Sequence, residues 1–280
     1  MIVDCHTHVW KYPDHLSDTL AEESGLMRAD PVERTVDLDD HFRAMASVDR
    51  AIVLATDFGY SGLRVPNEYV AEYVRSHPEK LIGFASVDPN DKGAPEKLEH
   101  AIQNLGLRGL KLGPIYQNFD PAGEDAMRVY ERANALGIPI LFHQATTFPR
   151  IAPLKYAHPI LLEEVALRFP DLKMVLAHLG HPWEVDTIVL IRKQPNVYAD
   201  ISALFYRPWQ FYNSMVLAQE YRVTQKLLFG TDYPVTTPEE SIDGLRGIND
   251  LVEGTKLPKI SETVTDEIIE RNTLEILDLD

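Results

Sequence analysis

The first ten residues read MIVDCHTHVW, and within them Asp4-Cys5-His6-Thr7-His8 carries two histidines that are two residues apart. In an extended chain, residues with this spacing point to the same side, so His6 and His8 can reach one metal ion. The stretch therefore predicts a first strand, from Ile2 to His6, whose carboxyl end presents two imidazoles.

The same arrangement returns further along the chain. IPILFH is an apolar strand candidate that ends in His143, and KMVLAH is another that ends in His178. Residues 230–234, GTDYP, place Asp232 where the last strand candidate ends. An aliphatic residue would be favoured inside each strand, so polar residues at these ends indicate chemistry.

Short β-rich runs alternate with helical segments along the whole chain, which is typical of parallel strands joined by helices. Eight such units favour an α/β fold of the (β/α)8 TIM-barrel type. An open doubly wound sheet would show much of the same alternation, but no glycine-rich dinucleotide fingerprint follows the first strand. The predicted strands cover residues 2–6, 51–55, 81–87, 108–112, 138–143, 172–178, 196–201 and 226–231.

Two connections are long. About 44 residues separate the first strand from the second, and residues 144–158 follow the fifth. Loops after barrel strands line the active-site mouth, so these two are candidates for substrate lids. The alternative is that they only decorate the surface.

Composition narrows the function classes. The chain of 280 residues has 27 basic and 43 acidic side chains, a formal charge of −16, which disfavours nucleic acid and anionic membranes as partners. Cys5 is the only cysteine, so no intrachain disulfide can form. The N-terminal residues do not read as a secretory signal, and no apolar run approaches the ~20 residues of a membrane span. We expect a cytoplasmic protein.

Four of the strand-end residues form a plausible metal set. Three imidazoles, from His6, His8 and His143, with the Asp232 carboxylate would suit Zn²⁺ and leave a position open for water or substrate. Each residue alone has a simpler explanation as a hydrogen-bonded structural residue. The remaining histidines, at positions 15, 41, 77, 100, 158 and 181, fall on loops or helices and are expected to be solvated or capping residues.

These motifs give the sequence a family resemblance. It resembles the amidohydrolase-related group of metal-dependent (β/α)8 enzymes, whose pattern is D-x-H-x-H, a strand ending in His, A-H-x-G, and G-T-D-x-P. Residues 4–8, His143, 177–180 and 230–234 match that pattern, and residues 268–279 resemble the group's final helix. The resemblance spans the chain and implies one domain over residues 1–280.

The resemblance also implies roles for these residues. His6, His8, His143 and Asp232 would coordinate one divalent metal, usually zinc, and His178 would be a catalytic residue beside it. The alternative for His178 is that it binds a second metal. The group's habit further implies a homodimer.

Four more residues are candidates for binding a substrate that carries a carboxylate. The resemblance implies that Lys111 in the fourth strand could be carbamylated to bridge two metals, as happens in some members of the wider superfamily. It could instead bind an anion as an ammonium, or pair with a buried carboxylate such as Asp4. Arg150 and Arg207 follow the fifth and seventh strands and could hold the carboxylate itself. Trp10 could stack against a ring, although loop aromatics also pack loops.

The leading functional hypothesis is hydrolysis of a small amide, lactone or cyclic ester by metal-activated water. In it, Asp232 accepts the proton of that water and His178 stabilises the oxyanion. The first alternative is non-oxidative decarboxylation of a small aromatic or unsaturated acid, because the group resembles aminocarboxymuconate semialdehyde and resorcylate decarboxylases. The second is a catalytically silent metal-binding protein, which would have no use for His178.

Overall fold

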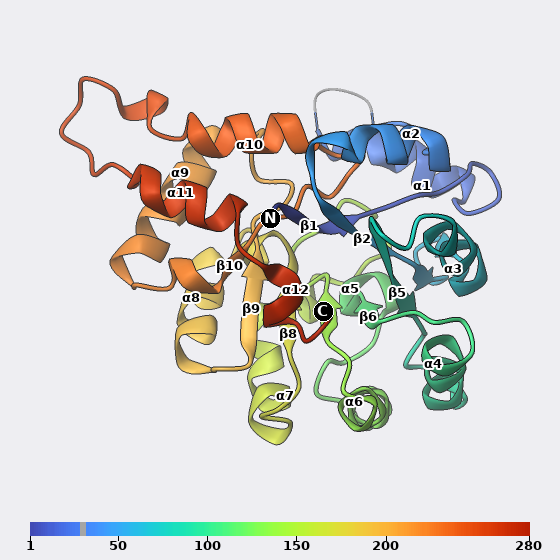
Figure 1. Ribbon diagram of the computed structural model, residues 1–280. Helices are drawn as coiled ribbons and strands as arrows, with labels where there is room; N and C mark the ends of the chain where they lie inside the picture. The colour runs from blue at the N-terminus through green and yellow to red at the C-terminus, as the bar shows by residue number, and fades with distance from the viewer. Residues whose placement is uncertain (29–31) are drawn as a thin grey trace.

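Eight parallel strands form one sheet in the computed structural model, which describes residues 1–28 and 32–280 (Figure 1). Neighbouring strands in the sheet are also neighbours along the chain, in the order β1-β2-β5-β6-β7-β8-β9-β10. The strands are β1 (Val3–Thr7), β2 (Arg50–Leu54), β5 (Leu81–Ser86), β6 (Gly109–Leu112), β7 (Ile140–Phe142), β8 (Met174–Leu176), β9 (Val197–Asp200) and β10 (Leu227–Leu228).

This order confirms the predicted barrel. A doubly wound sheet reverses its strand order at a switch point, whereas here every strand lies beside its predecessor. All eight predicted strands are present, with ends displaced by a few residues. The last one is shorter than predicted, because residues 229–231 leave regular pairing and bind the first strand instead.

The first and last strands meet through irregular hydrogen bonds. The backbone N–H of Cys5 donates to Phe229 O over 3.1 Å, and that of Asp232 donates to His6 O over 2.8 Å. The Asp4 carboxylate accepts the Thr231 backbone N–H at 3.0 Å and the Thr231 hydroxyl at 2.7 Å. These contacts join β1 to the segment after β10 and so close the ring.

Helices surround the strands (Figure 1). The α-helices are α1 (Asp18–Glu23), α2 (Leu38–Ala44), α3 (Asn67–Ser76), α4 (Ala94–Gln103), α5 (Pro114–Gln117), α6 (Glu124–Leu136), α7 (Glu163–Arg168), α8 (Glu184–Lys193), α9 (Pro208–Glu220), α10 (Pro238–Arg246), α11 (Glu262–Ile269) and α12 (Thr273–Ile276). Short 3₁₀ turns are η1 (Ser24–Leu26), η2 (Met45–Ser47), η3 (Leu154–Tyr156), η4 (Pro159–Leu162), η5 (Ala177–Gly180), η6 (Thr224–Lys226) and η7 (Asp250–Val252).

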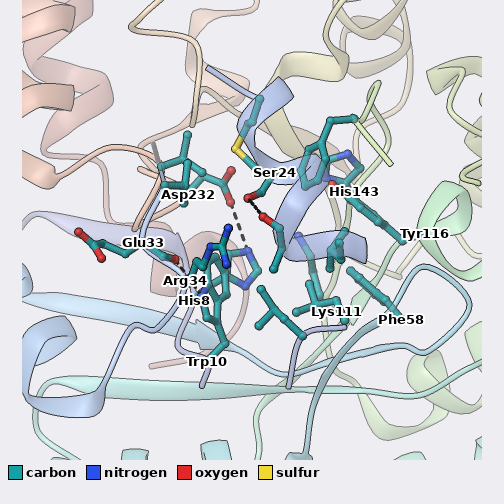
Figure 2. A pocket seen from close by; sticks show the side chains of 18 residues that line it. His8, Trp10, Ser24, Glu33, Arg34, Phe58, Lys111, Tyr116, His143 and Asp232 are labelled. Carbon is teal, nitrogen blue, oxygen red and sulfur yellow. Dashed lines mark hydrogen bonds and ion pairs between the residues drawn. The ribbon is translucent and has the colours of Figure 1, made fainter. Parts of the chain in front are cut away.

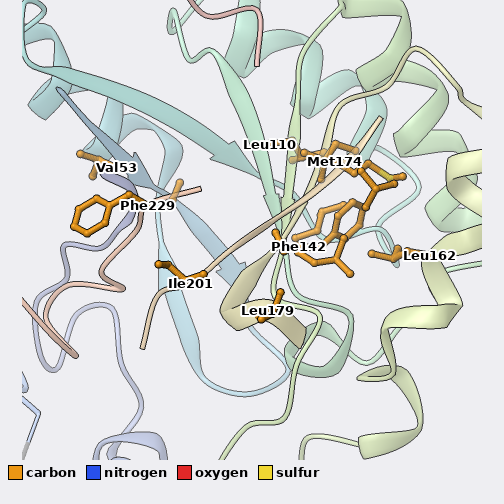
Figure 3. Close-up of a cluster of buried hydrophobic side chains, with 14 of the residues drawn as sticks. Val53, Leu110, Phe142, Leu162, Met174, Leu179, Ile201 and Phe229 are labelled. Atoms are coloured by element: carbon orange, nitrogen blue, oxygen red, sulfur yellow. The ribbon is translucent and has the colours of Figure 1, made fainter. Parts of the chain in front are cut away.

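Two apolar clusters hold the layers together. Strand side chains such as Val53, Leu110 and Phe142 pack outward against the helices (Figure 3). Alternate strand side chains, including Ile52 and Val175, fill the inside of the ring together with leucines of the C-terminal segment. Burying both faces of each strand explains why the strands read as nearly continuous apolar runs.

One element was not predicted. Directly after β2, the chain forms an antiparallel hairpin of β3 (Thr56–Phe58) and β4 (Leu63–Val65). Its buried Phe58 stacks on Tyr116, with ring centroids 5.2 Å apart. The two long connections are present as predicted, and both contribute to the pocket described below. In the described part of the chain, no helix has the length and apolar character needed to cross a bilayer.

Candidate metal centre and substrate pocket

Seven polar residues meet at the carboxyl ends of the barrel strands, all of them buried or nearly so. Because parallel strands all end on one side of a barrel, residues far apart in sequence converge there. They are His6 in β1, His8 after it, Lys111 in β6, His143 after β7, His178 in η5, Asp200 in β9 and Asp232 after β10.

His6, His8 and Asp232 meet as the sequence predicts. The Nε2 atoms of both histidines lie 3.2 Å from the same oxygen, Asp232 Oδ1. Strand β1 changes register against β2 between Asp4 and Thr7, at the position of the first histidine. Such irregularities redirect side chains near functional sites.

The hydrogen bonds fix which nitrogen of His6 carries the proton. His6 Nδ1 lies 2.9 Å from Asp200 Oδ2, a carboxylate oxygen that can only accept, so Nδ1 is the protonated nitrogen. The Nε2 of a neutral His6 is then a lone-pair acceptor, and it faces Asp232 Oδ1 with no proton between the two atoms. The hydrogen bond from His6 to Asp200 has the geometry by which a carboxylate orients a metal-binding histidine.

A similar situation holds for His143 and His178. His143 Nε2 donates to the Thr146 carbonyl at 3.0 Å, and His178 Nδ1 donates to the Ser202 carbonyl at 3.2 Å. Their other nitrogens, His143 Nδ1 and His178 Nε2, lie 3.2 Å apart. In the neutral side chains both of these atoms are unprotonated, so lone pairs again face one another.

These acceptors fit a bound cation. One ligand atom each from His6, His178 and Asp232 lies within 4.8 Å of the others. His8 reaches the group through its contact with Asp232, and His143 reaches it through His178. Nitrogen and oxygen donors of this kind are typical ligands of divalent transition metals. The close position of His178 is compatible with either role considered from the sequence.

The electrostatics of the centre favour deprotonated ligands. Burial alone would raise the pKa of Asp232, but the interactions with His6 and His178 outweigh it and hold that pKa well below its ordinary value. Burial lowers the pKa of His178 to about 4. The carboxylate is therefore ionised at neutral pH and the imidazole is neutral.

Lys111 points into the same centre. Its Nζ lies 3.0 Å from His6 Nε2, and burial lowers the pKa of its ammonium to about 8, although Asp232 and Asp200 act in the opposite direction. The suggested pairing with Asp4 is wrong, since the Asp4 carboxylate binds Thr231 instead. The Lys111 ammonium thus places a positive charge beside the unprotonated nitrogen of His6, a candidate metal ligand.

A pocket opens over the centre, and aromatic rings line it (Figure 2). Its inner part has Trp10 from the first long connection, Phe58 and Tyr116 on one wall, and Phe148 from the second long connection. A more polar part, which shares Tyr116, His143 and Asp232 with the first, extends to Thr146, Tyr206 and Arg207. Both long connections therefore contribute directly to the pocket walls.

The substrate-binding candidates do not all lie in this pocket. Trp10 and Arg207 line it, and the Arg207 guanidinium lies 4.4 Å from the centroid of the Tyr206 ring. Arg150 does not line either part of it. Its side chain is 83% exposed and pairs with Glu23, so the expectation that it meets the substrate is not supported. The sequence could not show which way this arginine leaves its loop.

The fold and the site geometry lead to a comparison with known families. The amidohydrolase family model matches residues 3–279. The chain belongs to the amidohydrolase family. This agrees with the motif resemblance and with the strand-end position of the site.

Two relatives are similar to this amidohydrolase in sequence. Gamma-resorcylate decarboxylase of Polaromonas is 23% identical over 227 residues, which cover 64% of this chain and 68% of that protein. Dihydroorotase of Helicobacter pylori is 33% identical over 138 residues, which cover 47% of this chain and 39% of that protein. The chain thus spans well under half of the dihydroorotase.

Solved structures share the fold at low sequence identity. A TIM-barrel protein of Bordetella bronchiseptica superimposes with a TM-score of 0.76 at 19% identity, over 99% of this chain and 98% of its own. A Burkholderia multivorans amidohydrolase with bound zinc gives 0.72 at 14%, over the whole of both chains. A Polaromonas dihydroxybenzoic acid decarboxylase with manganese and 2-nitroresorcinol gives 0.67 at 19%, over 99% of this chain and 97% of its own. At these identities the likeness concerns the fold alone.

Three site residues of this amidohydrolase were not predicted. Asp200 and Ser202 lie behind His6 and His178, and the Ser202 hydroxyl donates to Asp200 over 2.5 Å. Asp200 lies near the end of the apolar run 196–201, as His143 lies at the end of its own apolar run. The same pattern in the sequence could therefore have predicted Asp200 as a site residue. His41 was expected to be solvated or capping, which is wrong: it is fully buried beside β1.

Proposed function

We propose that this amidohydrolase is a metal-dependent decarboxylase of a small planar carboxylic acid, aromatic or conjugated. One observation carries the proposal. Unprotonated nitrogens of His6 and His178 lie close to the ionised Asp232 carboxylate, beneath a pocket with aromatic walls. The decarboxylase relative, aligned over about two thirds of both chains, supports this choice over hydrolysis.

In this proposal His6, His8, His143 and Asp232 hold one divalent cation, zinc or manganese. The bound cation would polarise the substrate's oxygen atoms and stabilise negative charge that develops on them. Asp200 and the Thr146 carbonyl hold the rings of His6 and His143 in the orientation that presents their lone pairs.

The pocket walls suggest how the substrate is held. Trp10, Phe58 and Tyr116 offer flat apolar faces to a planar substrate. The guanidinium of Arg207, in the polar part, could bind a carboxylate or phenolic oxygen with two parallel hydrogen bonds. A planar acid would therefore lie with its body among the rings and an anionic group towards Arg207.

His178 is the proposed proton carrier. When the carbon–carbon bond to the carboxylate breaks, CO₂ leaves and the bonding electron pair remains on the ring carbon. A proton must then bind that carbon. His178 Nε2 faces the centre while Nδ1 is held by Ser202, so the imidazole can take a proton from solvent at Nε2 and deliver it to that carbon.

Hydrolysis of a small lactone or cyclic amide is the second candidate. The dihydroorotase match favours it. The length of the chain gives hydrolysis no advantage, because the fold superimposes on 97% of the Polaromonas decarboxylase.

One experiment separates the two reactions. Protein loaded with Mn²⁺ or Zn²⁺ is screened against hydroxybenzoic acids, lactones and cyclic amides, first in D₂O and then in ¹⁸O-labelled water. We expect an aromatic acid to release CO₂ and to gain deuterium at the vacated ring carbon. Label from water in a new carboxylate would instead establish hydrolysis.

The matched controls are chelator-treated protein and Asp232→Asn, both of which should lose turnover. If the metal-loaded protein turns over no acid, lactone or amide, the proposal fails in favour of a silent metal-binding protein.

A further inference from the structure

A buried histidine that the proposed chemistry does not use lies behind the metal centre. His41, in α2, has no solvent exposure. Its Nε2 lies 2.9 Å from the Thr7 hydroxyl, and its Nδ1 lies 2.9 Å from the Tyr73 hydroxyl. The Tyr73 hydroxyl also lies 2.9 Å from the Leu38 carbonyl. Both ring nitrogens thus have partners.

Thr7, the residue that His41 holds, separates the two histidines of the motif. Side chains alternate along a strand, so Thr7 points away from the side on which His6 and His8 face the metal. Its hydroxyl donates to Ile52 O in β2 over 2.7 Å. Since that proton is committed, His41 Nε2 is the donor in the contact with Thr7. Nδ1 of the neutral ring is then an acceptor, so the Tyr73 hydroxyl donates its one proton to His41 rather than to the Leu38 carbonyl.

His41 also touches the segment that carries the carboxylate. Its ring packs edge-on against Tyr233, with centroids 5.6 Å apart. Tyr233 follows Asp232 directly, and its carbonyl accepts the backbone N–H of His8 over 2.9 Å. One imidazole therefore contacts a chain neighbour of His6 and His8 and a chain neighbour of Asp232.

We infer that His41 is a positioning residue for the metal centre, acting through Thr7 and Tyr233 on three of the four proposed ligands. This inference rests on the metal site put forward under the proposed function. A buried polar chain costs desolvation, and an aliphatic side chain would fill the space without that cost. A fully bonded chain does fix the positions of its members, and that is the property a coordination site needs.

Metal affinity, measured separately from stability, tests the inference. His41→Leu removes both hydrogen bonds at similar volume, and Thr7→Val removes only the hydroxyl that His41 holds. In folded protein titrated with Zn²⁺ against a chromophoric chelator, each variant should bind the ion about tenfold more weakly or worse. His41→Gln, which keeps a donor and an acceptor, should recover part of the affinity.

The control is a buried polar residue far from the centre. The Asn196 amide donates to the Phe169 and Leu172 carbonyls at the start of β9, so Asn196→Ala should lower the melting temperature of the metal-free protein but not the Zn²⁺ affinity. If His41→Leu and Thr7→Val behave like Asn196→Ala, His41 is only structural and the inference is overturned.

Wild-type protein in the same titration reports on the proposed function. If it binds Zn²⁺ and the variants bind equally well, only the role of His41 is wrong. If wild-type protein binds no divalent ion, the metal site and this inference both fail.

Discussion

Asp200 Oδ2 lies 2.9 Å from His6 Nδ1 and is fully buried behind it. The other oxygen of the carboxylate accepts the backbone N–H of His178 at 2.9 Å. Burial would raise the pKa of Asp200, but the contacts with His6 outweigh it, and the pKa lies well below its ordinary value. A permanent negative charge therefore orients one metal-ligand candidate and anchors the backbone of the proposed proton carrier.

Replacing that charge should weaken the metal site without removing a ligand. Asp200→Asn keeps the size of the side chain but no longer favours a proton on His6 Nδ1. We expect the affinity for Zn²⁺ to fall about 10- to 100-fold, as measured by chelator competition. Asp186→Asn, a change at a carboxylate that is 45% exposed, should leave the affinity unchanged and serves as the control. Equal affinities for both variants would contradict the role of Asp200.

Removing a direct ligand should reduce the metal content itself. Gently purified wild-type protein should hold about one divalent ion per chain. His6→Ala and Asp232→Ala should each lower that content, since both side chains converge on the same point. Elemental analysis of the three proteins provides the measurement. An unchanged content in both variants would show that the ion binds elsewhere.

His178→Asn should separate metal binding from turnover. We expect this variant to retain its metal and to lose about 10²- to 10⁴-fold in kcat, because it removes a proton carrier and not a ligand. The structure permits the other outcome, since His178 Nε2 belongs to the cluster around Asp232. Loss of the ion with recovery of activity at high metal concentration would make His178 a ligand.

The two arginines should differ in their effect on substrate binding. Arg207 lines the pocket, so Arg207→Ala should raise KM for an acidic substrate about 10- to 100-fold, the usual cost of losing a hydrogen bond to a charged group. Arg150→Ala should leave KM unchanged, because that side chain is exposed and pairs with Glu23. Steady-state kinetics with one substrate tests both. A larger effect at Arg150 would mean that the substrate reaches beyond the pocket.

Acid should destabilise the protein in a way that His41 accounts for in part. Burial, with a smaller effect of His8, lowers the pKa of His41 from 6.5 to about 3. As the pH falls, His41 of the unfolded chain therefore binds a proton near pH 6.5, whereas His41 of the folded chain binds one only near pH 3. The stability from this residue is complete above pH 6.5 and is lost as the pH falls towards 3.

The comparison with His41→Gln isolates this contribution. Between those pH values the free energy of unfolding of metal-free wild-type protein should fall more steeply than that of the variant, by about 1.4 kcal/mol per pH unit. Denaturant unfolding across the range measures the two slopes. Parallel slopes would mean that His41 is already protonated in the folded protein.

The sequence predicted the parts of the site that follow a strand. An apolar run that ends in a histidine carries its own signal, and the parallel barrel brings all such ends to one side. His143 and Asp232 could be placed in this way, and so could the two histidines of β1. The pattern needs only local sequence and one topological rule.

The features that the sequence could not predict depend on packing between distant segments. His41 lies in a helix among Asp39, Asp40 and Arg43, neighbours that suggest an exposed face, and only the docking of α2 and α3 on β1 buries it. The hairpin of β3 and β4 follows β2 after a single residue, so its first strand could not be separated from the apolar run before it. The position of Arg150, outside the pocket and paired with Glu23, could not be predicted because a loop sequence does not state which way its side chains point.

The joint between β1 and the segment after β10 has a consequence for the order of events during synthesis. Asp4 and His6 leave the ribosome well before their partners Thr231 and Asp232, which follow more than two hundred residues later. Until then the nascent sheet has two open edges, and the histidines of β1 lack their carboxylate. Such distant contacts are slow to form because the intervening chain must first be ordered. The proposed metal site is thus incomplete until the segment that carries Asp232 has been translated.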